Sequence, residues 1–91
     1  MIRRVRIIYD QKNNTVKGSS LTIRDWVRYK VNESPENIVY KDEFSTIFCR
    51  NRENRVFIVY AYTHRNAQKA LRKHFNNPLI SEADYEKAQS I

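Results

Sequence analysis

The chain has 91 residues, of which 41% are hydrophobic, 12% aromatic and 30% charged, and its formal net charge is +7. This length predicts one compact domain over residues 1–91, and the aromatic content excludes a disordered chain. No apolar run reaches the roughly 18 residues of a membrane span, and we expect no signal peptide after Met1. We therefore expect a cytoplasmic protein without a membrane partner.

Residue types that hold metals or cofactors are few and scattered. The single cysteine, Cys49, can form neither an internal disulfide nor a cysteine-based zinc site. His64 and His74 lack the spacing of zinc ligands, and the carboxylates are dispersed. The only glycine, Gly18, cannot build a glycine-rich phosphate loop. We therefore expect no metal and no cofactor.

The first twenty residues predict a strand and a loop. Residues 1–10 alternate, so that if Val5, Ile7 and Tyr9 face the core, Arg4 and Arg6 stand together on the opposite face with Ile2 and Ile8. Residues 11–20 are polar and predict a long loop. In this loop, the asparagine pair at positions 13 and 14 suits a left-handed turn.

Residues 22–31 predict a helix. Thr22 is its expected N-cap, because Asp25 follows three residues later as in a capping box. Pro35 ends the segment. Five residues at helical spacing form the predicted packing stripe: Ile23, Trp26, Val27, Lys30 and Val31.

The middle of the chain predicts strands over 38–41, 44–50 and 55–63. The last two form a hairpin turning at positions 53 and 54, so that Phe48 opposes Val59. The two sheet faces expected from this register hold Phe44, Phe48, Phe57, Val59 and Ala61, and Ile47, Cys49, Ile58, Tyr60 and Tyr62, respectively.

Two helices are predicted after the hairpin. The first covers 63–75 with Thr63 as N-cap, and the second covers 81–91. The order β-α-β-(β)-β-α-α indicates an α+β fold, a small and mainly antiparallel sheet of three or four strands with helices on one face. An exposed edge strand at 2–9 or 38–41 favours a homodimer. The packing stripe of the first helix is Ala67, Ala70, Leu71, His74 and Phe75.

The basic charge is the main functional signal, because a domain pI above about 9 is typical of nucleic-acid-binding proteins and this sequence has a pI near 9.8. Three clusters are candidates: a helix face that tracks phosphates, an arginine-rich hairpin tip, and strand arginines beside tyrosines that stack on bases. Their residues are Arg65, Lys69, Arg72 and Lys73; Arg50, Arg52 and Arg55; and Arg3, Arg4 and Arg6 with Tyr60 and Tyr62. The structural alternatives are a solvated helix face, edge protection, and core tyrosines.

These features predict a small RNA-binding protein without enzymatic activity and with broad sequence tolerance. A second hypothesis is a phage-type or mobile-element-type accessory protein that binds and inhibits a host protein, with its basic patches covering an acidic surface. A third is a metal-independent ribonuclease that uses His64 and His74 as acid and base. However, the two histidines lie ten residues apart on one predicted helix, about 15 Å along its axis.

Overall fold

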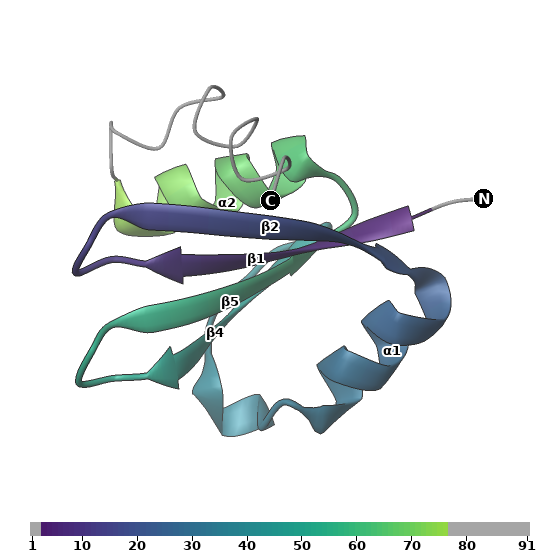
Figure 1. Cartoon of the computed structure of the whole chain (residues 1–91), viewed down its shortest axis with the longest axis horizontal. Coiled ribbons are helices and arrows are strands. Elements are labelled where there is room, and N and C mark those ends of the chain that lie inside the picture. Colours follow the sequence, from purple (N-terminus) through teal and green to yellow (C-terminus); the bar gives the residue numbers. More distant parts are fainter. Residues whose placement is uncertain (1–2, 77–91) are drawn as a thin grey trace.

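Five strands and two α-helices make up the computed structural model, which describes residues 3–76 (Figure 1). The predicted helix over 81–91 lies outside the described residues. In chain order the elements are β1 (Arg3–Asp10), β2 (Thr15–Thr22), α1 (Ile23–Asn32), the 3₁₀ turn η1 (Pro35–Asn37), β3 (Ile38–Lys41), β4 (Ser45–Asn51), β5 (Val56–Ala61) and α2 (His64–Phe75).

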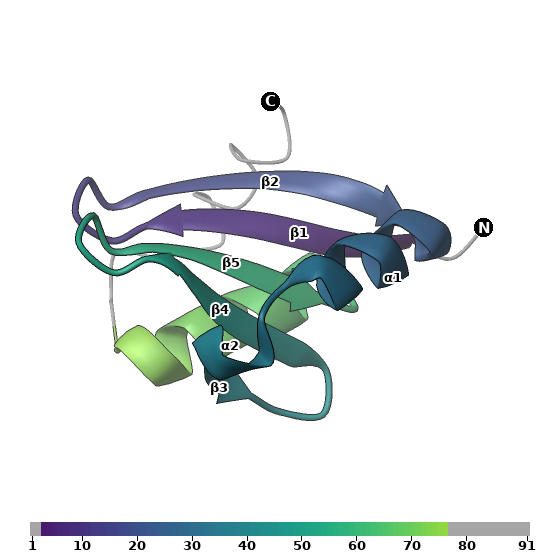
Figure 2. The same ribbon diagram turned by 90° about the horizontal axis from the view of Figure 1, so that it is seen from below.

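The strands form one antiparallel sheet in the order β2-β1-β5-β4-β3 (Figure 2). The α+β class is therefore confirmed, with five strands where three or four were expected. The additional strand is β2, which was predicted as part of a loop. The segment 2–9 was expected as an edge strand, but β1 lies between β2 and β5, so the edges of the sheet are β2 and β3.

The two helices cover opposite faces of the sheet, as Figure 1 shows, and not one common face as predicted. Helix α2 packs over β4, β5 and β1, and α1 packs over β1 and β2. Alternation along β1 explains how both faces are occupied. Ile7 points into the core beneath α2, whereas Ile8 packs with the cluster beneath α1.

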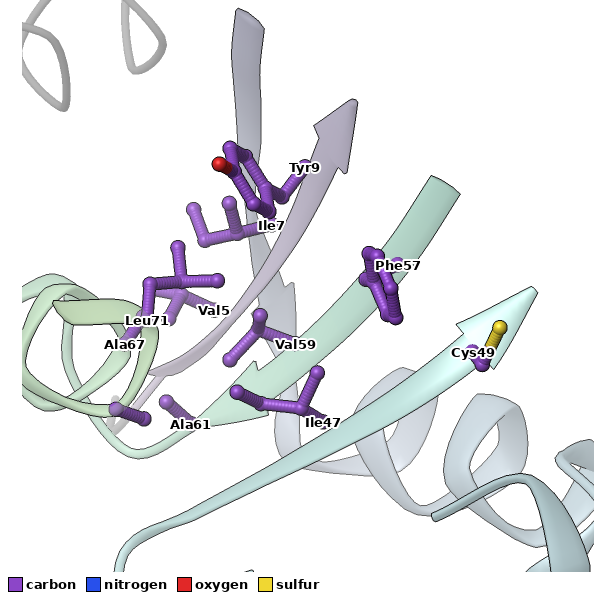
Figure 3. Packing of buried hydrophobic residues seen from close by; sticks show 11 residues of the cluster. Val5, Ile7, Tyr9, Ile47, Cys49, Phe57, Val59, Ala61, Ala67 and Leu71 are labelled. Carbon is purple, nitrogen blue, oxygen red and sulfur yellow. The ribbon is translucent and has the colours of Figure 1, made fainter. Parts of the chain in front are cut away.

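The larger hydrophobic core lies between the sheet and α2, and Figure 3 shows its packing. Leu71 is fully buried against the strands, and so are both alanines of the predicted stripe, Ala67 and Ala70. Phe75 packs its ring against Tyr9 and Phe57, with ring centroids 4.9 Å and 4.7 Å away. The predicted stripe is thus confirmed except at His74, whose side chain is exposed.

Helix α1 covers the other face with few residues. Trp26 and Tyr29 pack on the cluster formed by Leu21, Phe48, Ile58 and Tyr60, but no residue of α1 is fully buried. The predicted packing stripe of this helix is wrong at three positions, because the sheet contacts the side of α1 next to that stripe. The exposed residues are Ile23 at 40%, Val27 at 47% and Val31 at 75%.

This exposure predicts that Val27 adds little to stability. Replacing Val27 by lysine is expected to change the free energy of unfolding by less than about 0.5 kcal/mol, as for other surface substitutions. Urea unfolding of the two proteins measures the difference. A loss of more than about 2 kcal/mol would place Val27 in the core, as the sequence pattern predicted.

The predicted register of the β4–β5 hairpin is correct at its tip and wrong beyond it. Asn51 pairs with Val56, as a four-residue turn centred on positions 53 and 54 requires. A bulge at Arg50 then shifts the register by one residue, so that Phe48 opposes Ile58 and not Val59. The corrected faces hold Ile47, Cys49, Phe57, Val59 and Ala61 beneath α2, and Phe48, Ile58 and Tyr60 beneath α1.

Local capping signals are confirmed where the sequence predicted them. The hydroxyl of Thr22 accepts a hydrogen bond from the backbone N–H of Asp25, at 3.1 Å, and Thr63 likewise accepts from Asn66, at 3.1 Å. Asn14 occupies the expected left-handed turn position, with a φ of 53°. These signals are local in sequence, which is why the ends of both helices were predicted within one residue.

Candidate nucleic-acid interface

The outer side of α2 carries a row of exposed cations. Arg65, Lys69, Arg72 and Lys73 all lie on its solvent side, as their spacing predicted. Among residues 3–76, no carboxylate oxygen lies within 4.0 Å of the charged groups of Arg65, Lys69 or Lys73. The ion pair in the described part of the chain joins Arg28 to Asp25 at 3.4 Å, on α1. Arg65, Lys69 and Lys73 therefore present their charge to solvent.

A pocket of about 260 Å³ adjoins this row, between α2 and the loop that joins β3 to β4. The carboxylate of Asp42 organises the loop, since it accepts hydrogen bonds from the backbone N–H groups of Phe44 and Ser45, each at 2.8 Å. Although burial raises the pKa of Asp42, these bonds, the Tyr40 hydroxyl and nearby Lys73 together hold that pKa below its usual value. The lining residues are Tyr40, Asp42, Glu43, Phe44, Ser45, Asn66, Lys69 and Lys73.

Two exposed aromatic rings lie at the end of the sheet where β4 begins and β5 ends. Phe44 is 44% exposed and Tyr62 is 39% exposed, and their ring centroids are 5.7 Å apart in an edge-to-face arrangement. The backbone N–H of Tyr62 donates to the carbonyl of Phe44 at 3.1 Å, which fixes the pair. Phe44 also lines the pocket beside Lys69, so its ring is adjacent to the cationic row, whereas the Tyr62 ring also contacts Trp26 of α1.

Arg4 and Arg6 lie over aromatic rings on the α1 side, on the sheet face predicted for them. The guanidinium of Arg4 lies 4.2 Å from the ring centroid of Tyr62 and 5.6 Å from that of Trp26. The guanidinium of Arg6 lies 4.4 Å from the ring of Tyr29. The strand arginines and Tyr62 are therefore close, as predicted, although Trp26 and Tyr29 were not among the predicted site residues.

Tyr60 is a core residue. Its side chain is 1% exposed, and its hydroxyl donates to a carboxylate oxygen of Glu33 at 3.1 Å. The ring is therefore not accessible for the predicted stacking on a base. Burial and the Glu33 carboxylate raise the pKa of Tyr60 to about 12, against a smaller lowering effect of Arg6.

An alkaline titration is expected to reveal the buried hydroxyl of Tyr60. The folded state holds this proton up to about pH 12, whereas the unfolded chain loses it near pH 10. The contribution of Tyr60 to stability is thus intact below pH 10 and lost as the pH rises through 12. Phenolate absorbance is expected to show a late step that Tyr60→Phe removes, and a step near pH 10 for every tyrosine would contradict the burial.

The arginines of the hairpin tip lie at the opposite end of the sheet from Phe44 and Tyr62. Arg50, Arg52 and Arg55 are all exposed. The carbonyl of Arg55 accepts from the backbone N–H of Gln11 at 3.0 Å, so this turn is tied to the β1–β2 turn. Phe75, at the end of α2, packs beside the same turns. The tip therefore lies at the same end of the sheet as the C-terminal end of α2 (Figure 1).

The predicted site residues do not form one surface. The α2 row lies over one sheet face and the hairpin tip at one end of the sheet, whereas Arg4 and Arg6 lie on the other sheet face, beneath α1. Arg3 is exposed at the start of β1 and shares the parity of Val5, which places it on the α2 face. The clearest residue missed by sequence analysis is Phe44, which was assigned to a sheet face and instead lies in the loop before β4.

The two histidines stay apart at opposite ends of α2. His64 is half-buried, and burial lowers its pKa, whereas His74 is exposed and contacts the ring of Tyr40. The geometry therefore does not assemble the acid–base pair of the ribonuclease hypothesis. Within residues 3–76, no three His, Cys, Asp or Glu side chains gather to hold a metal ion. No helix in that range has the length and hydrophobicity needed to cross a membrane.

No protein-family model, curated protein or solved structure matches this chain.

Proposed function

We propose that this protein binds single-stranded RNA with broad sequence tolerance and without catalysis. The observation that carries the proposal is the exposed ring of Phe44 beside the row of exposed cations on α2, with the partly exposed ring of Tyr62 next to it. Cations in a row provide sites for successive phosphates, and aromatic rings provide stacking partners for bases. Together they supply both contacts that a flexible strand needs.

The geometry favours a single strand over a duplex. Bases of a duplex are stacked on one another, so the exposed ring of Phe44 can stack only on an unpaired base. Stacking on such rings contributes about 1–3 kcal/mol per base and does not depend on base identity. Arg65 and Lys69 contact phosphates in this proposal, which makes the affinity dependent on salt.

Fluorescence anisotropy with labelled single-stranded RNA, duplex RNA and duplex DNA, at 50 and 200 mM salt, tests the proposal. We expect the tightest binding to single-stranded RNA, weaker binding at the higher salt, and about tenfold weaker binding by Phe44→Ala. Val31→Ala, which truncates an exposed side chain on α1, is the matched control and is expected to bind as the wild type does. Absence of binding at 50 mM salt would contradict the proposal.

A second candidate, docking on a host protein as an inhibitor, is favoured by the exposed stripe of Ile23, Val27 and Val31 on α1. Arg24 and Arg28 border this stripe, so the partner that fits it combines apolar and acidic side chains. Two results together would favour this candidate over the first. The wild-type protein would bind no bare RNA, and it would capture an acidic protein that the Val27→Asp variant does not capture.

A further inference from the structure

Two carboxylates, those of Asp42 and Glu43, line the pocket between α2 and the loop that joins β3 to β4. They differ in their hydrogen bonding. Asp42 accepts hydrogen bonds from the Tyr40 hydroxyl and from the N–H groups of Phe44 and Ser45, all at 2.8 Å. Glu43 lines the same pocket, and within residues 3–76 its carboxylate takes part in no hydrogen bond or ion pair. Glu43 is therefore the acceptor that this pocket offers to a ligand.

The other walls restrict the chemistry of that ligand. Phe44 supplies an exposed aromatic ring, and Lys69 and Lys73 supply positive charge one helical turn apart. A bare anion would be repelled by the carboxylate of Glu43. A planar group with hydrogen-bond donors on one edge and an attached phosphate would instead complement Glu43, Phe44 and the two lysines. The volume of about 260 Å³ lies just below the roughly 300–1,000 Å³ of pockets for drug-sized ligands, which suits one nucleobase.

We propose that this pocket holds one guanine base of the bound strand, stacked on Phe44 and read by Glu43; the proposal rests on the proposed function. Guanine presents two adjacent donors, N1–H and the N2 amino group, on its Watson–Crick edge. A carboxylate accepts such a parallel pair with its two oxygens. Adenine and cytosine present one amino donor, and uracil presents one imino donor. This edge is accessible in single strands only.

The experiment compares ten-nucleotide uridine strands in which one central position is uridine, guanosine, inosine, adenosine or cytidine, by anisotropy at 50 mM salt. We expect the guanosine strand to bind at least about fivefold tighter than the adenosine and cytidine strands, as for a bidentate contact. Inosine lacks the N2 amino group and is expected to lose most of this preference. Glu43→Gln, which replaces one acceptor oxygen by a donor, is expected to abolish the preference.

The matched control is Glu36→Gln, which makes the same charge change at an exposed position in η1 and is expected to keep the guanosine preference. Equal binding of the guanosine and adenosine strands would overturn the guanine pocket, and so would a preference that survives Glu43→Gln. In both cases binding of the all-uridine strand would leave the proposed RNA-binding function standing. Failure of every strand to bind would overturn both proposals.

Discussion

Reversing two charges on α2, with Arg65→Glu and Lys69→Glu together, is expected to weaken binding of single-stranded RNA by about 100-fold at 50 mM salt. Each change removes a phosphate contact and adds repulsion, and about 1.4 kcal/mol corresponds to a tenfold change. The dependence of log Kd on log salt is also expected to fall by about 0.7 for each lost contact. Anisotropy titrations over a range of salt concentrations measure both quantities.

Net charge alone would also weaken binding, so the control must change it equally. Arg24→Glu with Lys17→Glu makes the same change in net charge at exposed positions on the α1 side of the sheet. We expect the fold-increase in Kd of this variant to be less than about a fifth of that of the α2 variant. Equal losses in the two variants would show that RNA responds to total charge and not to the α2 row.

Leu71→Ala is expected to have the largest effect on stability, about 2–5 kcal/mol. Leu71 is fully buried between α2 and the sheet, so truncation leaves a cavity in the larger core. Domains of this size have a free energy of unfolding of about 5–15 kcal/mol, so the loss is a large fraction of the total. Urea unfolding followed by circular dichroism measures the change.

The comparison for Leu71 is Val31→Ala, a truncation at a position that is 75% exposed. It is expected to change the free energy of unfolding by less than about 0.5 kcal/mol. A Leu71→Ala protein as stable as the Val31→Ala protein would mean that α2 does not pack on the sheet in solution. The packing of α2 on the sheet is also what turns the cationic row toward solvent, so such a result would contradict that orientation.

Helices with strong local signals could be predicted from sequence, and so could most strands. The threonine caps and the alanine and leucine spacing of α2 depend on residues within one or two turns of each other. Strand β2 could not be predicted, because an edge strand buries little: Leu21 is its only buried residue, so its polar sequence lacks the alternation of a strand. The bulge at Arg50 shifts the register by one residue, which no local pattern indicates.

The candidate site could likewise be predicted from sequence only in part. The α2 cations could be predicted because their common side follows from helical spacing alone. The position of Phe44 beside the row could not be predicted, since it depends on contacts with Tyr62 and with the side of α2, both distant in sequence. Tyr60 was predicted to stack on bases because the sequence does not reveal that α1 covers its face of the sheet.

Chemical-shift mapping of the isotopically labelled protein with a ten-nucleotide uridine RNA tests the central claim most directly. The proposal predicts that amide signals of Phe44, Tyr62 and the α2 segment from Arg65 to Lys73 shift in proportion to RNA added, while those of Val27 and Val31 stay unchanged. Shifts confined to α1, or no shifts at RNA concentrations well above that of the protein, would contradict the account.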